Sequence, residues 1–474
     1  MTKKYFYITT TLPYVNSDPH IGFAMEIIRA DVVARFKQLM GYEVIFNTGT
    51  DEHGQKIYQT AVKAKKDPKS YCDEYAAKFN NLKTALNLIY THFIRTTDEY
   101  HIKAAQEFWK RCFKNNDIYK TKYQIKYCVG CELEKTDSEL VDNKCPVHLN
   151  LKLEIIEEEN YFFKFSKYQS TLLDLYQKNP QFVLPDFRQE EIKQFVKKGL
   201  QDFSVSRLKE KMPWGIPVPN DPLHVMYVWF DALINYISTL GWPKNQENFK
   251  KYWPGVQIAG KDNLRQQSAM WQAMLISAGL PPSKQIFIEG FITSEGKKMS
   301  KSLGNVVDPY QLVKKYGTDA VRYYLLREIP PYEDGDYSEK RMKELYNSDL
   351  ANELGNLVMR ITTLAEKDGL TVNNETPLRP SSFEGQTMKQ FDNFEFNLIL
   401  ENIWKQIKTL NKQIDDFAPW NKKSEDRKDF LFQSFKTLRS TAWELQPFLP
   451  ETSQKILQAT TGKISKISPL FPRI

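Results

Sequence analysis

The stretch GKKMSKSLGN, at positions 296–305, places three lysines and two serines within six residues between two glycines. Lysines on a loop that can close are suited to hold a polyphosphate while negative charge builds up on it. A basic turn that is merely solvated is the other interpretation. The choice depends on what else in the chain can bind a nucleotide.

A second candidate is the motif PHIG at positions 19–22, between a strand-like stretch and a helix-like stretch. In a parallel sheet such a turn faces the ligand crevice, and the start of the helix attracts anions. His20 can donate a hydrogen bond to a phosphate, and Gly22 lets a base or ribose lie against the backbone. A structural turn would look the same, so the motif becomes specific only when it is paired with KMSKS.

A metal site is indicated by three cysteines that fall within 18 residues and are followed by a histidine. Cys128 and Cys131 form a C-x-x-C pair, and Cys145 and His148 form a C-x-x-H pair. Three thiolates and one imidazole make a closed tetrahedral set, which is typical of structural zinc and leaves no open position for catalysis. We expect one zinc ion that folds this segment, and we prefer this to coincidental thiols.

The elements that must position these residues begin with a parallel unit. Residues 4–14 alternate like a strand, residues 22–41 repeat apolar side chains at helical spacing, and residues 42–50 form a second strand-like run. This order predicts a βαβ unit with parallel strands. The pattern is interrupted from about 119 to 222, which indicates an insertion.

The strand pattern then returns in GVQIAG and KQIFIEGFI, at positions 255–260 and 284–292. Two helices are expected to follow, with Asp308 and Thr318 as their N-caps. From about residue 340 onward, long amphipathic helical patterns dominate, which predicts a separate helical domain.

Composition places the chain among globular proteins. With 474 residues, 41% of them hydrophobic and 26% charged, it should form roughly two to four domains. The net charge of +8 permits a polyanionic partner without requiring one. No apolar run is long enough to span a membrane, and the N-terminal stretch has neither a signal core nor an Arg-rich transit pattern. We therefore expect a cytoplasmic protein with no membrane partner.

Longer strings carry a family resemblance. The chain contains, in this order, TTLPYVNSDPHIG, ADVVARFKQLMGYEVIFNTGTDEHGQKI, YVWFDALINY, AGKDNLR, NELGNLVMR and FAPW. With HIG and KMSKS, these strings resemble the class I aminoacyl-tRNA synthetases, and among them the methionyl-tRNA synthetases in their short bacterial form. The resemblance runs from about Tyr5 to Arg473, which is essentially the whole chain.

The resemblance implies an α/β fold in four segments. A Rossmann-type parallel-sheet catalytic domain is expected in two halves, at 1–118 and 223–338, and the second half carries the KMSKS loop and stem-contact helices. A connective insertion with a zinc knuckle is expected at 119–222. An α-helical anticodon-binding domain is expected at 339–474.

The implied reaction is a ligase reaction that uses ATP with Mg²⁺. The methionine carboxylate attacks the α-phosphate, pyrophosphate leaves, and the methionyl group passes to the terminal adenosine of tRNA. His20, Lys298 and Lys301 are the implied catalytic residues, and Asp262 would accept from a ribose hydroxyl. The implied ATP-binding residues are His20, Gly22, Gly260, Asp262, Lys298, Met299, Ser300, Lys301 and Ser302.

The resemblance also implies a methionine pocket, in which Asp51 meets the substrate ammonium. Trp229, Ala232 and Tyr236 are spaced to lie on one helical face. Without the family, the aromatic residues would be interpreted as core. The implied methionine-binding residues are Leu12, Tyr14, Asp51, Trp229, Ala232, Tyr236, Gln267 and Trp271.

For tRNA, the resemblance implies recognition of a CAU anticodon in initiator and elongator methionine tRNA. Asn352, Asn356 and Arg360 recur every four residues and could read base edges, while Trp420 could stack an unpaired base. A polar helix face and a core tryptophan are the alternative interpretation. We expect a monomer, because the chain ends with PLFPRI, without the extra tRNA-binding domain that dimerises some relatives.

The match departs from the family at a few positions. Phe23 stands where the first signature usually has its second histidine, and Asn263 and Gln267 replace the usual residues beside the methionine pocket. A degenerate tRNA-binding paralogue without catalytic activity therefore stays open as an alternative. So does a class I synthetase for another amino acid, although the short insertion leaves no room for a large editing domain.

Overall fold

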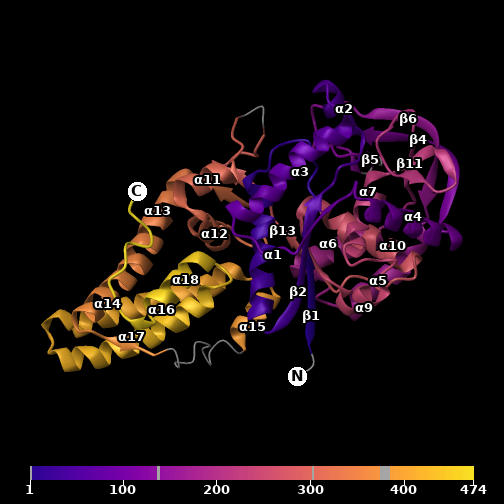
Figure 1. Ribbon diagram of the computed structural model, residues 1–474. Coiled ribbons are helices and arrows are strands. Elements are labelled where there is room, and N and C mark those ends of the chain that lie inside the picture. Colours follow the sequence, from indigo (N-terminus) through magenta and orange to yellow (C-terminus); the bar gives the residue numbers. More distant parts are fainter. Residues whose placement is uncertain (1–2, 136–138, 301–303, 374–384) are drawn as a thin grey trace. The chain divides into compact units, whose positions relative to one another are not determined.

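The computed structural model describes residues 3–135, 139–300, 304–373 and 385–474 (Figure 1). Its contacts divide the chain into two compact units. The first unit comprises Met1–Pro19, Tyr42–Asn81 and Tyr90–Ile288. The second unit comprises His20–Gly41, Leu82–Ile89 and Glu289–Ile474. The domain boundaries expected at residues 118, 222 and 338 stay predictions.

The central element of the first unit is a six-stranded sheet. Figure 1 shows β1 and β2 side by side, and their register runs from Lys4↔Tyr42 to Thr9↔Asn47. The pairs β3–β2, β2–β1, β1–β12 and β13–β7 are all parallel. The strand order is β3(His92–Arg95), β2(Tyr42–Thr50), β1(Lys4–Thr9), β12(Val256–Gly260), β13(Gln285–Glu289) and β7(Val183–Leu184).

Strands β1 and β2 are buried along most of their length, as parallel strands covered on both faces should be. In such sheets, ligands bind beyond the carboxyl ends of the strands. The functional residues of this unit should therefore follow Thr9, Thr50 and Gly260.

The insertion forms its own antiparallel sheet. Strands β4 and β6 pair from Ile118↔Phe163 to Tyr127↔Glu154, and the cysteine cluster begins with the last residue of β4 and continues in the segment that leads to β6. The four-stranded order is β5(Leu133–Lys135), β4(Ile118–Cys128), β6(Glu154–Phe163) and β8(Phe203–Ser204). A smaller sheet has the order β10(Pro217–Val218), β11(Asp221–Met226) and β9(Ser206–Leu208).

Helices and helical turns connect these strands. Residues of α3 up to Asn81 belong to the first unit. The elements are α2(Gln55–Lys63), α3(Pro68–Ala85), α4(Glu99–Lys114), η2(Phe165–Tyr168), α5(Gln169–Lys178), α6(Asp186–Lys197), α7(Val228–Ala232), α8(Asn235–Ser238), α9(Gln246–Tyr252), η3(Lys261–Asn263), the π-helical turn η4(Gln266–Met270) and α10(Trp271–Ser277).

The second unit is largely helical, as expected from residue 340 onward. In α16, the buried residues recur every three or four positions from Phe396 to Ile414, so one face packs into the unit. Its helices are α1(Ile21–Leu39), α11(Pro309–Tyr316), α12(Thr318–Arg327), α13(Glu339–Leu345), η6(Tyr346–Gly355), α14(Asn356–Lys367), α15(Gln386–Asp392), α16(Phe396–Phe417), η8(Pro419–Asn421), α17(Ser424–Leu445) and α18(Pro450–Ala459). Two small strand pairs complete it, β14(Ile292–Ser294) with β15(Gly335–Tyr337) and β16(Thr371–Val372) with β17(Gly462–Lys463).

The predicted fold class is confirmed by the parallel sheet, the insertion and the helical C-terminal region. Within the described residues, no helix is both long and apolar enough to cross a membrane.

One of the two expected N-caps is correct. The Asp308 side chain accepts a hydrogen bond from the backbone N–H of Tyr310, at 2.8 Å, and so caps α11. The prediction for Thr318 was wrong, because Gly317 occupies the cap position of α12. The Thr318 hydroxyl instead donates to the carbonyl of Ala85, at 2.9 Å, which ties α12 to another segment of the same unit.

A buried arginine joins four segments of the second unit. The Arg322 guanidinium donates to the carbonyls of Leu86, Pro447 and Phe448, at 2.8–3.1 Å. It also forms an ion pair of 2.8 Å with Asp31 of α1, and both side chains are fully buried. Because a guanidinium holds several donors in one plane, it can satisfy all four acceptors at once.

Removing this side chain should destabilise the second unit. Arg322→Ala leaves three carbonyls without this donor, and Asp31 loses one of its two ion-pair partners. We therefore expect a loss of about 3–5 kcal/mol in the free energy of unfolding. Arg341→Ala is the control, because its ion pair with Glu328 is exposed and should contribute at most about 1 kcal/mol. Urea unfolding followed by circular dichroism measures both, and equal losses would contradict the anchoring role of Arg322.

Candidate active site

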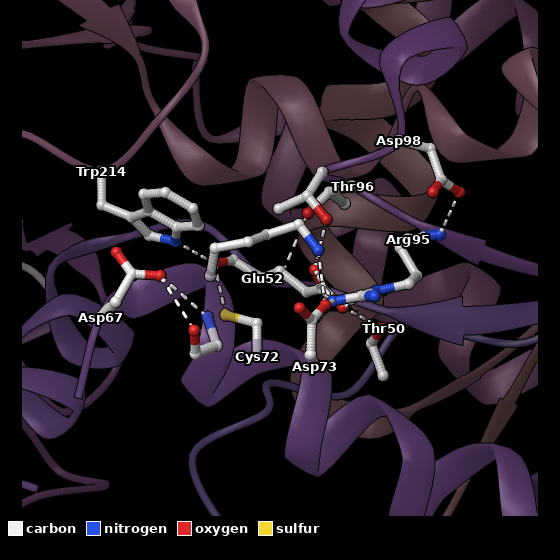
Figure 2. A network of polar contacts seen from close by, with 12 residues as sticks. Thr50, Glu52, Asp67, Cys72, Asp73, Arg95, Thr96, Asp98 and Trp214 are labelled. Atoms are coloured by element: carbon white, nitrogen blue, oxygen red, sulfur yellow. Dashed lines mark hydrogen bonds and ion pairs between the residues drawn. The ribbon is translucent and has the colours of Figure 1, made fainter.

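Glu52 fixes the turn that follows β2 (Figure 2). Its carboxylate is fully buried and forms a two-pronged ion pair with Arg95, with Nε–Oε1 at 2.5 Å and Nη2–Oε2 at 2.9 Å. The hydroxyls of Thr50 and Thr97 donate to the same two oxygens. A buried carboxylate is tolerated when its charge is paired and its oxygens are hydrogen-bonded, and Glu52 meets both conditions.

The backbone of Glu52 is held as firmly as its side chain. Its N–H donates to the Thr96 hydroxyl at 2.9 Å, and its carbonyl accepts from the indole N–H of Trp214. The neighbouring Asp51 and His53 therefore have little freedom to move.

Asp51 lies beside Tyr14 at the carboxyl end of the sheet. The two residues form an isolated parallel bridge, and the N–H of Asp51 donates to the carbonyl of Pro13 at 3.0 Å. Burial raises the pKa of Asp51 well above its usual range, and the carboxylates of Asp231 and Glu132 add to the shift. A buried carboxylate of this kind is stabilised by a cation, and an ammonium group has the required charge.

Two histidines that the sequence analysis did not select meet at Asp231. His53 Nδ1 lies 3.1 Å from one carboxylate oxygen, and His101 Nε2 lies 3.6 Å from the other. The other nitrogen of His101 lies 2.9 Å from the Ser238 hydroxyl. Burial opposes ionisation of Asp231, but the two imidazoles outweigh it and hold its pKa below the usual value. The chain has only six histidines, and one of them, His53, lies in the string DEHG. Together with the aspartate of the string WFDA, this was a signal that could have suggested the contact between His53 and Asp231.

The expected pocket residues on α7 and α8 do not share one helix. Trp229 and Ala232 lie in α7, whereas Tyr236 lies in the separate helix α8. The break follows from Asn235, whose side chain donates to the carbonyl of Ala232 at 2.7 Å and takes the place of a backbone partner. The single helical face predicted from their spacing was therefore wrong.

Tyr236, Gln267 and Trp271 are brought together in the buried interior of the first unit. Gln267 Nε2 donates to the Tyr236 hydroxyl at 2.7 Å, and its Oε1 accepts from Gln257 at 3.1 Å. The rings of Tyr236 and Trp271 meet edge to face, with centroids 5.9 Å apart. Gln267, which departs from the family pattern, thus links this tyrosine to the buried polar side chain of Gln257.

Several of the expected pocket residues carry a buried polar atom that lacks a partner among the described residues. The hydroxyl of Tyr14 and the indole nitrogens of Trp229 and Trp271 form no hydrogen bond with any described residue. Such groups are rare in folded proteins and call for an explanation, of which a ligand is one. Leu12, the remaining expected pocket residue, is partly exposed beyond the end of β1.

The expected adenosine residues of the first unit follow β12. Gly260 ends the strand, and Asp262 lies in the next turn, exposed to solvent, where it accepts from Asn263 at 3.1 Å. Strand β12 is the neighbour of β1, so both residues lie at the carboxyl edge where nucleotides bind in such sheets.

In the second unit, His20 caps helix α1. Its Nδ1 accepts from the backbone N–H of Gly22 at 3.1 Å, so in the neutral ring the proton is on Nε2, which stays available as a donor. A Cβ at position 22 would lie 2.9 Å from His20 Cε1. Gly22 is therefore required by the cap itself, in addition to any contact with a nucleotide.

The basic loop begins with a tight turn. Ser294 and Lys297 exchange two backbone hydrogen bonds, with Glu295 and Gly296 at positive φ between them. Asn305 then accepts from the N–H of Ser300 at 2.9 Å and donates to the carbonyl of Lys298 at 3.2 Å.

The lysines of the described part of this loop are available to an anion. Lys297 and Lys298 are both exposed to solvent. Met299 is half-buried beside them. Lys301 and Ser302 lie outside the described residues.

The four expected zinc ligands are brought together. One ligand atom from each of Cys128, Cys131, Cys145 and His148 lies within 4.8 Å of all the others. Cys131 Sγ lies 3.4 Å from Cys145 Sγ and 3.1 Å from His148 Nδ1. A Cβ at Gly130 would lie 2.6 Å from the His148 ring, so the glycine makes room for this ligand. The donor set and spacing fit a closed tetrahedral zinc site.

The expected anticodon residues lie in the second unit. Trp420 is 52% exposed, which excludes a core role, and the Arg360 guanidinium lies 5.6 Å from the centre of its ring. Asn352 lies in the π-helical stretch η6, where the wider turn alters the expected four-residue spacing, and it accepts from Arg473 at 2.6 Å. Asn356 begins α14 and is partly exposed.

The model of the family described as tRNA synthetases class I (M) matches residues 6–154 and 149–362. The methionine–tRNA ligase of Thermotoga maritima is 44% identical over 96% of this chain and 75% of its own length, and that of Synechocystis is 42% identical over 96% and 89%. The chain belongs to the class I methionyl-tRNA synthetases.

The solved structures of the family agree. A Mycobacterium tuberculosis methionyl-tRNA synthetase in complex with methionyl-adenylate matches with a TM-score of 0.92 and 37% identity, over 99% of this chain and 100% of that one. Membership of the methionyl-tRNA synthetases removes the alternative of a synthetase for another amino acid.

Gln267 should matter to methionine more than to ATP. Gln267→Met keeps a similar volume but removes the donor to Tyr236 and the acceptor for Gln257, so we expect a loss of about 1–3 kcal/mol in unfolding free energy and a raised KM for methionine. Gln285→Met is the control, since that amide donates only to an exposed carbonyl. Pyrophosphate exchange and urea unfolding measure the effects. If the KM values for ATP and methionine rose by the same factor, Gln267 would not belong to the methionine site.

Proposed function

We propose that this chain catalyses both steps of methionine–tRNA ligation. In the first, an oxygen of the methionine carboxylate attacks the α-phosphorus of ATP and pyrophosphate leaves. In the second, a hydroxyl of the 3′-terminal adenosine of methionine tRNA attacks the activated carbonyl, and AMP leaves. The observation that carries the proposal is Asp51, a buried carboxylate without a cationic partner among the described residues, which lies beside Tyr14 at the carboxyl end of a parallel sheet. The chain also belongs to this family.

Positioning and electrostatics supply most of the rate in such a reaction. Asp51 binds the substrate ammonium, and the aromatic rings of Trp229, Tyr236 and Trp271 suit a thioether. His20 donates from Nε2 to a phosphate, and Lys298 with Lys301 holds the β- and γ-phosphates as charge grows on them. Mg²⁺, when bound with ATP, neutralises part of the same charge.

Recognition of tRNA belongs to the helical part of the chain in this proposal. Trp420 stacks an unpaired anticodon base, and Arg360, Asn352 and Asn356 read base edges of CAU in initiator and elongator tRNA. The exposed indole beside a guanidinium supports this assignment. We further propose that the chain acts as a monomer and, because translation supplies its tRNA, in the cytoplasm.

The insertion holds one structural zinc ion in this proposal. Cys128, Cys131, Cys145 and His148 supply four ligands and leave no position for substrate. The ion would fold the knuckle and take no part in the chemistry.

A degenerate paralogue that binds tRNA without catalysis is the competing candidate, and Phe23 is the residue that favours it. Phe23 is buried at 8% exposure in the second unit. It thus packs into the interior, and its presence does not require that the site has lost activity.

Pyrophosphate exchange with each of the twenty amino acids tests the central proposal. Exchange should depend on methionine, and Lys301→Ala should lower the rate of adenylate formation at least about tenfold, or ~1.4 kcal/mol, with a smaller effect on methionine binding. Lys297→Ala is the control, because that lysine is exposed and has no proposed role. Absence of exchange with any amino acid would favour the non-catalytic paralogue.

The zinc proposal predicts one metal ion per chain. Cys145→Ala should lose the zinc and loosen residues 128–148, measured by elemental analysis and hydrogen exchange. Cys112→Ala, a buried cysteine outside the cluster, should keep the metal. Carefully purified wild-type protein without zinc would refute the assignment.

Trp420→Ala should separate the two half-reactions. Loss of a base stack costs about 1–3 kcal/mol, so tRNA charging should fall roughly ten- to a hundredfold while methionine-dependent exchange stays nearly unchanged. Phe432→Ala, an exposed aromatic on α17, is the matched control. If Trp420→Ala reduced exchange and charging by the same factor, Trp420 would be a folding residue.

A further inference from the structure

Glu132 directly follows the zinc-ligand candidate Cys131, but its carboxylate belongs to a different environment. The residue is 1% exposed and has a positive φ of 51°. Its Oε1 accepts from the backbone N–H of Lys56, at 2.8 Å, in the first turn of α2. That helix starts after Gly54, which has no side chain to cap it, so Glu132 supplies the cap from a distant part of the chain.

The turn after β2 is shaped to receive this carboxylate. A Cβ at Gly54 would lie 2.8 Å from Glu132 Oε2 and 3.3 Å from Oε1, and Gly54 has a φ of 109°. The backbone carbonyl of Glu132 accepts from the hydroxyl of Tyr227, the residue that precedes α7. Glu132 therefore touches both the turn that carries Asp51 and the start of the helix that carries Trp229.

One oxygen of the buried Glu132 carboxylate has no hydrogen-bond donor among the described residues. Glu132 Oε2 has no hydrogen-bond partner of normal geometry among the described residues, and neither has the buried hydroxyl of Tyr14. Burial raises the pKa of the Tyr14 phenol well above its usual range, and the charge of Glu132 is the next largest cause. An acceptor and a donor that are both buried, unsatisfied and electrostatically coupled form a natural pair.

We propose that Glu132 is a positioning residue for the amino-acid substrate. Its Oε2 accepts a hydrogen bond from Tyr14 Oη, and this bond fixes the tyrosine ring against bound methionine. Hydrogen bonds in a site often tighten only when substrate binds, so the free protein need not show this bond fully formed. The inference rests on the proposed function, because it takes Tyr14 to line the methionine site.

The consequence concerns the metal knuckle. Cys131 and Glu132 are adjacent in the chain, so the cluster that folds the knuckle also sets the position of a carboxylate that acts on the methionine site.

A double-mutant cycle tests this pair. Glu132→Gln keeps one oxygen for the N–H of Lys56 but removes the charged acceptor for Tyr14, and Tyr14→Phe removes the donor. Each variant should raise the KM for methionine about tenfold, with the KM for ATP changed less than about twofold. The double variant should be no worse than the worse single variant, because both changes remove one interaction. Glu154→Gln, an exposed carboxylate of the same insertion, should leave both KM values unchanged.

Two results would overturn the inference. One is that the effects of the two single variants on the KM for methionine multiply in the double variant. The other is that Tyr14→Phe leaves the KM for methionine unchanged. Zinc content and thermal unfolding are measured on every variant, and loss of zinc in Glu132→Gln would assign the residue to the fold. If Glu132→Gln does not fold, Tyr14→Phe alone decides. Wild-type protein without methionine-dependent exchange would refute the proposed function, whereas active wild-type protein with multiplying effects refutes only the pairing.

Discussion

The ion pair between the buried carboxylate of Glu52 and the partly exposed Arg95 is the constraint on which the candidate site depends. It joins the carboxyl ends of β2 and β3, where Thr50 and Arg95 are partners in register. A buried carboxylate is costly to desolvate, and Glu52 is tolerated here because Arg95 pairs its charge and hydroxyl groups satisfy its remaining acceptor positions. Because Glu52 is held in this way, the residues on either side of it in the turn cannot rearrange independently.

Four carboxylates lie buried in this part of the first unit, and three of them have a compensating partner within it. Glu52 has Arg95, Asp231 has two imidazoles, and Glu132 has a helix N-terminus. Asp51 has no cation among the described residues, and its neighbours add negative potential. Among the described residues, Asp51 is thus the one of these four carboxylates without a compensating partner, and a substrate with an α-ammonium group is suited to supply the missing charge.

Local patterns predicted what local physics determines. The Cys and His spacing brought four ligands together, and the strand and helix periodicities gave the parallel sheet and the helical second unit. Contacts between distant segments could not be predicted in this way. His101 meets Asp231 across 130 residues, and Glu132 caps a helix through the N–H of Lys56, 76 residues earlier in the chain. Asn235 broke an expected helix, and Gly317 displaced an expected cap, because tertiary partners outweighed local propensity.

The exposure of Trp420 has a consequence for spectroscopy. All nine tryptophans lie in the described residues, and Trp420 is the one whose ring is largely exposed, while the others are buried or half-buried. A water-soluble quencher such as iodide should therefore reach this indole in preference to the rest. The fluorescence lost to the quencher reports one known position, so shielding of that signal can follow the approach of an RNA without any label attached to either molecule.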